Sequence, residues 1–292
     1  MVCARLTNLP LLISGEVFVS GLRDNNFEIN AMRFTTHGTA YFCSDSNPKT
    51  MVFVHGVGIV GAVWQPQLNY FSNTYQTVTY DLLGHGKSPM PQEEVTLDDY
   101  VEQLNDLVEF LEVSSFSLVG HSMGAIISIA FALKYPNKVE ALVPMNIVFN
   151  RTDKAQLEVL ERANQVLNDN KILNVQQTLD RWFRHNNNKK SEKIAKVKKW
   201  LEQSSPRGYG LTYRLFALSD KVFLNKLSNL CCPVLYLTGD DDPNSTPEMS
   251  RKMAKLTPLG EFVSVEGEAH MLPYIAANKA NPIIENYLKN AK

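Results

Sequence analysis

The sequence predicts an α/β fold, with a mostly parallel central sheet, helices on both of its faces and an inserted helical cap. Strand-like and helix-like segments alternate along most of the chain, which is typical of a parallel sheet. One strand, at 116–119, leads into Gly120-His121-Ser122-Met123-Gly124 and then directly into an apolar helix rich in small residues. Residues 150–228 interrupt the alternation, because they carry many charges, hold no convincing buried strand and have the pattern of several helices.

The elements before the cap belong to the expected sheet and its covering helices. Alternating polar and apolar residues at 16–36 predict one or two antiparallel edge strands, and the apolar run at 51–54 predicts a buried strand. Thr96 is predicted to be the N-cap of an amphipathic helix, because Asp99 follows it three residues later. The remaining predicted elements of this half are a helix at 64–71 and strands at 76–82, 116–119 and 139–147.

The cap is predicted at 149–228, so that the core consists of residues 1–148 and 229–292. A chain of 292 residues with 44% hydrophobic content buries a large core, either as one domain with an insertion or as two domains. After the cap, a terminal helix at 274–288 is expected to break near Pro282. The predicted cap helices are 153–168, 175–185, 190–203 and 207–226, with a loop at Asn186-Asn187-Asn188, and the later strands are 233–239 and 261–266.

Composition excludes several classes of partner. The formal charge of −1 and the pI near 6.6 give no attraction to nucleic acid or anionic lipid. The four cysteines show no CxxC spacing, and no histidine cluster suggests zinc, so we expect no metal and reduced thiols. The apolar run at 9–13 is too short for a secretory signal, and no stretch approaches the roughly 20 apolar residues of a spanning helix. The sequence therefore predicts a cytoplasmic protein without membrane or nucleic-acid partners.

Ser122 is the predicted nucleophile. A serine in a tight turn between strand and helix adopts a backbone conformation that few residues tolerate, and glycines two positions on either side let the chain reverse without a clash. The alternative is a serine in an ordinary strand-to-helix turn. The β-prone residues before Gly120 and the apolar helix after Gly124 favour the nucleophile elbow.

A serine nucleophile requires a base to accept its proton. His270 is the predicted base, because Gly267-Glu268-Ala269-His270 follows the last predicted strand, where strand ends point toward the elbow. Of the other five histidines, three lie in turn motifs where an imidazole more often bonds backbone groups, and two lie in poorly defined loop or cap positions. The three are His55, His85 and His121, and the two are His37 and His185.

The acid that orients the base should lie after a strand between nucleophile and base, and Asp240-Asp241-Asp242-Pro243 fits this place. Asp242 is favoured over Asp241 and Asp240, since the following proline biases residue 242 toward an extended, rigid backbone. The order Ser, Asp, His is the one expected for a nucleophile elbow.

Backbone amides are expected to stabilise the oxyanion that forms when a carbonyl is attacked. The residue after the nucleophile, Met123, supplies one candidate amide. Val57 supplies the other, because His55-Gly56-Val57-Gly58 follows the first parallel strand and its glycines allow close approach of the backbone. A tight turn without a ligand is the alternative for this loop.

These motifs, in this order and over nearly the whole length, resemble the α/β-hydrolase fold superfamily of serine esterases and lactonases. The matching segments include 81–88, which reads Asp-Leu-Leu-Gly-His-Gly-Lys-Ser, besides the loops already named. Within the superfamily, the cap segments Arg181-Trp182-Phe183 and Pro206-Arg207-Gly208-Tyr209 resemble the group that includes 3-oxoadipate enol-lactonases.

The resemblance implies a catalytic triad of Ser122, Asp242 and His270 that hydrolyses a carboxylic ester or lactone through an acyl-enzyme, without metal or organic cofactor. Two alternatives share the fold. The first is a C–C bond hydrolase of the meta-cleavage type, and the second is a non-catalytic ligand-binding or signalling protein. The sequence leaves the natural substrate and the oligomeric state open.

Substrate binding is assigned to the cap. Arg181 or Arg184 is predicted to pair with a carboxylate of a small-molecule substrate, because both flank Trp182. Four aromatic residues are candidates for an apolar acyl pocket, although such residues more often form a cap's own core. They are Trp182, Phe183, Tyr209 and Tyr213.

Overall fold

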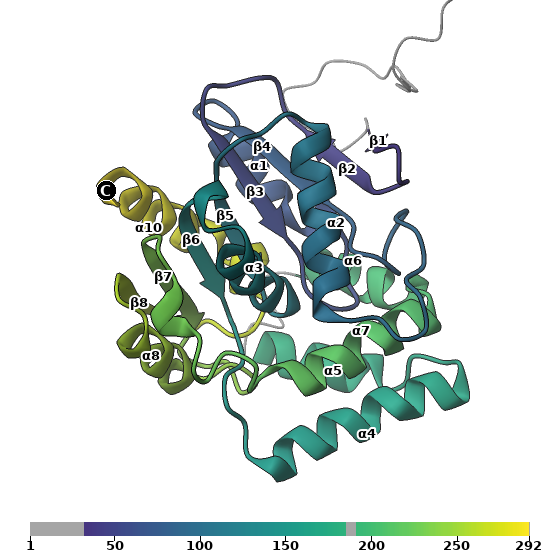
Figure 1. Cartoon of the computed structure of the whole chain (residues 1–292). Coiled ribbons are helices and arrows are strands. Elements are labelled where there is room, and N and C mark those ends of the chain that lie inside the picture. Colours follow the sequence, from purple (N-terminus) through teal and green to yellow (C-terminus); the bar gives the residue numbers. More distant parts are fainter. Residues whose placement is uncertain (1–31, 185–190, 292) are drawn as a thin grey trace, which may run out of the picture.

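The computed structural model describes residues 32–184 and 191–291, and within them the chain forms one sheet of eight strands in the order β1-β2-β4-β3-β5-β6-β7-β8 (Figure 1). The strands from β4 to β8 in this order pair in parallel, and the two at the other edge pair antiparallel. The predicted mostly parallel sheet is therefore confirmed. The strands are β1 (Arg33–Phe34), β2 (Ala40–Cys43), β3 (Thr50–Val54), β4 (Gln76–Tyr80), β5 (Phe116–His121), β6 (Val139–Met145), β7 (Val234–Gly239) and β8 (Gly260–Val265).

Helices cover both faces of the sheet, so the central strands are buried on both sides and read as continuous apolar runs (Figure 1). Helices α2 (Leu97–Phe110) and α3 (Met123–Lys134) pack together on one face, whereas α1 (Gln65–Phe71) and α10 (Ala277–Asn290) pack together on the other. Helix α8 (Pro247–Leu256) packs on β7 and β8. At the start of α2, Thr96 and Asp99 form the predicted capping box.

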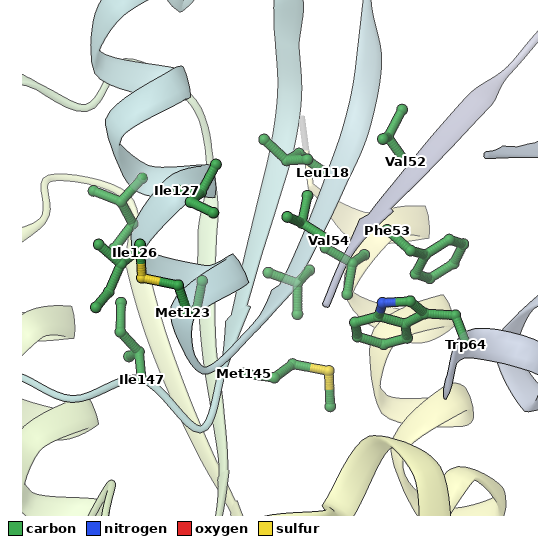
Figure 2. Close-up of a cluster of buried hydrophobic side chains, with 14 of the residues drawn as sticks. Val52, Phe53, Val54, Trp64, Leu118, Met123, Ile126, Ile127, Met145 and Ile147 are labelled. Atoms are coloured by element: carbon green, nitrogen blue, oxygen red, sulfur yellow. The ribbon is translucent and has the colours of Figure 1, made fainter. Parts of the chain in front are cut away.

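The core that supports the elbow joins α3 to the central strands. Figure 2 shows Met123, Ile126 and Ile127 of α3 on one side of these strands and Phe53 with Trp64 on the other. All five side chains are fully buried, and the rings of Phe53 and Trp64 lie 5.1 Å apart. Because α3 begins immediately after Ser122, this packing fixes the position of the candidate nucleophile.

Among the described residues, four α-helices lie between β6 and β7, beyond the carboxyl ends of the strands (Figure 1). They are α4 (Asp153–Asp169), α5 (Val175–Phe183), α6 (Ser191–Gln203) and α7 (Pro206–Ser219). We propose that they form the cap of residues 149–228 on a core of residues 1–148 and 229–292. Helix α7 meets the loop after β4 so closely that a Cβ on Gly208 would lie 2.0 Å from Gly84 O.

Several boundaries differ from the prediction. The last cap helix ends at Ser219 rather than 226, because Asp220 turns inward to bind Arg151. Pro282 does not break the terminal helix: it lies inside α10, and the break falls at Ala276, which separates α10 from the short α9 (Leu272–Ile275). Burial of Ala280 and Ile284 against the core offsets the hydrogen bond that the proline removes.

Other predictions are only partly covered. The expected edge strands at 16–36 are represented by β1, and residues 16–31 lie outside the described residues, as do His185 and the loop Asn186-Asn187-Asn188. The strand β2 was not predicted. No helix in the described ranges is long and apolar enough to cross a membrane.

Candidate active site

Ser122 occupies the turn between β5 and α3 with φ of 57° and ψ of −115°, a strained conformation for a residue with a side chain. Its N–H donates to Met145 O at 2.9 Å, which ties the turn to β6. The flanking glycines are required by space: a Cβ on Gly124 would lie 2.1 Å from Val54 O, and one on Gly120 would lie 2.4 Å from Gly124 O. The predicted elbow geometry is therefore present.

His270 and Asp242 meet beside this turn. The carboxylate Oδ2 of Asp242 accepts a hydrogen bond of 2.7 Å from His270 Nδ1, and both side chains are buried. Asp242 follows β7 and His270 follows β8, so the carboxyl ends of two parallel neighbours bring them together. Of the other two aspartates, Asp240 accepts from Gly267 N–H and Asp241 is exposed, and neither bonds His270.

The carboxylate of Asp242 is held in its charged form. Burial alone would raise its pKa, but the charge of His270 and hydrogen bonds from His270, Asn146 and Asn244 outweigh burial and hold the pKa below its usual value. A buried carboxylate that stays ionised can orient an imidazole and stabilise its protonated form.

The loop after β3 lies against the elbow, since a Cβ on Gly56 would approach Ser122 Cβ to 3.1 Å. This loop and the loop after β4 are joined by two reciprocal histidine bonds. His55 Nε2 accepts from Leu82 N–H at 2.9 Å, and His85 Nε2 accepts from Gly58 N–H at 3.0 Å. Each ring therefore carries its proton on Nδ1, which donates to a carbonyl of its own loop.

Two backbone amides, one in the loop after β3 and one at the start of α3, are available to a ligand. Within residues 32–184 and 191–291, neither the N–H of Val57 nor that of Met123 donates to an acceptor. Met123 is the first residue of α3, where amides have no partner inside the helix and the helix dipole favours negative charge. These are the two amides that the sequence predicted for the oxyanion.

His121 supports the base instead of competing with it. Its Nε2–H donates to His270 O at 2.8 Å, and the two rings lie 4.9 Å apart. Burial lowers the pKa of His55 to about 4 and those of His85 and His121 to about 3, so all three are neutral near pH 7. The expectation that these turn histidines bond backbone groups is confirmed. His37 lies at the surface beside Asp106.

A cavity of about 350 Å³ lies between the strand ends and helices α4, α5 and α7. Ser122 and His270 both line it, as do the predicted substrate-binding residues Arg181, Trp182 and Tyr209. Trp182 packs on the His270 ring at 5.7 Å, and its carbonyl accepts from Met271 N–H. Helix α5 is thus bonded to the loop that carries the candidate base.

Two of the predicted substrate-binding residues, Phe183 and Arg184, do not line the cavity. Phe183 is completely buried among apolar residues and does not line the cavity, because it occupies the inward face of α5. Arg184 is exposed and is also absent from the cavity wall. Of the two arginines predicted to pair with a substrate carboxylate, Arg181 lines the cavity and Arg184 does not.

Helix α4 contributes to the site although no residue of it was predicted there: it presents Glu158 and Arg162 to the cavity, and Arg151 lies just before it. The signal was available as one face of an amphipathic helix, on which residues 155, 158, 159 and 162 recur at helical spacing. Arg151 is neutralised by Asp220 at 3.1 Å. Arg162 and Arg181 instead contact Tyr213 Oη and Thr178 Oγ1, and neither pairs with a carboxylate among the described residues.

The charges of Arg181 and Arg162 both act on the hydroxyl of Tyr209. Burial and the neighbouring Tyr213 raise the pKa of the Tyr209 hydroxyl, whereas Arg181 and Arg162 act to lower it. Arg162, Arg181 and Tyr209 all line the same cavity. In the part of the chain that the structure describes, no three His, Cys, Asp or Glu side chains converge as metal ligands would.

Comparison with known proteins agrees with the observed fold. The family model described as alpha/beta hydrolase fold matches residues 49–276. The chain is 34% identical over 260 residues to an Acinetobacter baylyi protein named (E)-2-((N-methylformamido)methylene)succinate hydrolase, covering 88% of this chain and 97% of that one. It is 29% identical over 252 residues to a Pantoea ananatis protein named putative carbamate hydrolase RutD, covering 84% and 90%.

Among solved structures, the enol-lactonase from Burkholderia xenovorans LB400 is similar in fold, with a TM-score of 0.77 at 19% identity over 86% of this chain and 97% of that one.

Proposed function

The chain belongs to the alpha/beta hydrolase fold family, and we propose that it is a serine-dependent hydrolase that cleaves a carboxylic ester or lactone through an acyl-enzyme intermediate. One observation carries the proposal. A serine in a strained turn and a buried histidine–aspartate pair open onto the same cavity. A strained serine backbone beside a buried, ionised histidine–aspartate pair is typical of a catalytic centre.

In the proposed reaction, Ser122 Oγ attacks the acyl carbon while His270 takes its proton. Asp242 accepts the Nδ1–H bond and stabilises the imidazolium that forms. The negative oxygen lies between the amides of Val57 and Met123, at the N-terminal end of α3. His270 then protonates the leaving alcohol, and a water molecule that it activates releases the acid.

A carboxylate on the substrate is part of the proposal. Arg181 and Arg162 line the cavity beside the aromatic surfaces of Trp182 and Tyr209, and among the described residues neither forms a salt bridge, although Glu158 lines the same cavity. The A. baylyi relative is named for a succinate, which agrees with an acidic substrate. Guanidinium groups bind carboxylates in well-defined geometry, so they would select for such a group.

The arginines provide a matched test of this part. Arg181→Met should raise KM for an acidic ester by about tenfold and leave a neutral ester unaffected, as expected for loss of one charged contact. Arg184→Met is the control, because Arg184 is exposed and outside the cavity. Equal behaviour of the two variants toward both esters would contradict the assignment.

A fluorophosphonate probe tests the nucleophile without knowledge of the substrate. The wild type and Ser115→Ala should be labelled, whereas Ser122→Ala should not. Ser115 is a suitable control, because its hydroxyl bonds Glu140 at the start of β6, at the opposite end of the sheet. Failure to label the wild type under several conditions would favour a non-catalytic binding protein.

Cleavage of an acyl C–N bond is a second candidate, favoured by the 34% identical relative, whose name includes an N-methylformamido group. Paired ester and N-acyl enamine substrates with the same acid portion would separate the two by their kcat/KM. A vinylogous diketone in the same assay would test the C–C hydrolase alternative.

A further inference from the structure

Asp242 is held by the side chain of Asn146, the residue that follows β6. Its Oδ1 accepts two bonds from its own loop, from Asn244 N–H at 2.8 Å and Ser245 N–H at 3.2 Å. Its Oδ2 accepts from His270 Nδ1 at 2.7 Å and from Asn146 Nδ2 at 2.8 Å. Within the described residues, Asn146 is thus the one side chain besides the base that bonds this carboxylate.

The position of Asn146 is fixed by backbone bonds. It follows β6 with φ of 49°, in the left-handed region that asparagine tolerates better than most residues. Its N–H donates to Leu237 O at 2.9 Å, and its carbonyl accepts from Ser245 Oγ at 2.6 Å. The residue is therefore attached both to β7 and to the loop that carries Asp242.

Within the described residues, the side-chain amide of Asn146 forms hydrogen bonds through its nitrogen but not through its oxygen. Nδ2 also lies 3.4 Å from Thr238 Oγ1 and from Ala269 O, whereas Oδ1 is buried and has no hydrogen-bond partner within the described residues. A buried carbonyl oxygen without a donor costs stability, and an apolar side chain would avoid this cost. The atom that has hydrogen-bond partners is Nδ2, which donates to the carboxylate of Asp242.

We propose that Asn146 is a positioning residue of the catalytic triad, which holds Asp242 in the orientation and charged state that His270 needs. The inference rests on the proposed function. The amide donor occupies the second acceptor site of Oδ2 and, together with the two backbone N–H groups that bond Oδ1, keeps the carboxylate facing His270. It also stabilises the carboxylate relative to the acid, which keeps the mobile proton on the imidazole.

The expected signature is a shift in pH dependence. In the described ranges, two titratable groups face Asp242. His270 is in direct contact with it, and His121 lies close enough for the charge of Asp242 to act on its imidazole. Loss of the amide donor raises the proton affinity of Asp242. The acid limb of the reaction should therefore move to higher pH, which a merely structural residue would not cause.

The experiment measures the rate of fluorophosphonate labelling against pH in the full chain. Asn146→Gly keeps the left-handed backbone and should react at least tenfold more slowly at pH 7, with an acid limb at higher pH. Asn146→Asp keeps the shape but brings a second carboxylate against Asp242, so its acid limb should move further. Asn170→Gly is the control, since Asn170 is a left-handed, exposed helix C-cap and should change nothing but stability.

Proton NMR gives a readout that does not require turnover. The Nδ1–H of His270 should appear strongly deshielded in the wild type, identified by its loss in His270→Gln, and should be lost or shifted in Asn146→Gly. If both Asn146 variants label at the wild-type rate with an unmoved acid limb, the inference is wrong. If the wild type itself does not label, the proposed function fails, and an unchanged NMR signal in Asn146→Gly would then overturn the inference separately.

Discussion

Substitution of Gly124 by alanine should disable the site through backbone displacement alone. Gly124 lies in the first turn of α3, and a Cβ there would be 2.1 Å from Val54 O and 2.6 Å from His55 O. Both are backbone atoms at the end of β3, so no side chain can yield. To reach the shortest tolerated contact of 3.0 Å, α3 and β3 must separate by about 0.9 Å.

The separation affects the candidate oxyanion donors directly, because α3 carries the amide of Met123 and the loop after β3 carries that of Val57. A hydrogen bond of about 2.9 Å would lengthen to about 3.8 Å, beyond the normal range. Loss of one such donor typically costs about 100- to 1000-fold in kcat. Overpacking should also cost about 1 to 3 kcal/mol of stability.

The assay is the kcat for an aryl ester together with the fluorophosphonate labelling rate, with circular dichroism to establish that the variant is folded. Gly210→Ala is the control, since a Cβ at this position meets only side-chain atoms of Leu167 and Val166, which can move aside. A folded Gly124→Ala protein that reacts within about threefold of wild type would show that the approach of α3 to β3 does not set the oxyanion geometry.

Two further predictions concern stability. Burial lowers the pKa values of His55, His85 and His121 to about 4, 3 and 3 from 6.5, so the unfolded chain binds more protons below pH 6.5. Stability should be complete above that pH and fall by about 2 kcal/mol per histidine by pH 5, as measured by urea unfolding; equal unfolding free energies at pH 7 and pH 5 would contradict this. Asp220→Ala should destabilise by about 3 to 5 kcal/mol, because it leaves the buried Arg151 without its partner. Restored stability in Asp220→Leu with Arg151→Met would confirm that the stranded charge is the cause.

The sequence predicted best where a requirement is local. The elbow needs a strand, two glycines and a helix within ten residues, and each is visible in the residues around Ser122. The choice of Asp242 among three aspartates depended on Pro243, and the contact with His270 agrees with it. The mostly parallel sheet was predicted from the alternation of strand-like and helix-like segments, and the strand pairing confirms it.

The sequence predicted least well where two distant segments meet. Asn146 and Asp242 are 96 residues apart, and no periodicity at residue 146 indicates which strand will lie beside it. The position of Pro282 inside α10 has the same origin, because a proline's effect on a helix depends on what the helix buries. The cavity face of α4 was visible as a pattern, but whether that face covers a core or a cavity depends on α7, against which α4 packs.

Each chemical group of the candidate site is held by a partner from a different loop. The loop of Val57 is joined to the loop after β4 by the reciprocal histidines, and Asp242 is joined to β6 by Asn146. The base has two attachments, since His121 holds the carbonyl of His270 and the carbonyl of Trp182 holds the next amide. One of these attachments comes from the sheet and the other from α5. A substrate that displaced α5 would therefore move the base relative to Ser122, so the helix that lines the cavity also contributes to triad geometry.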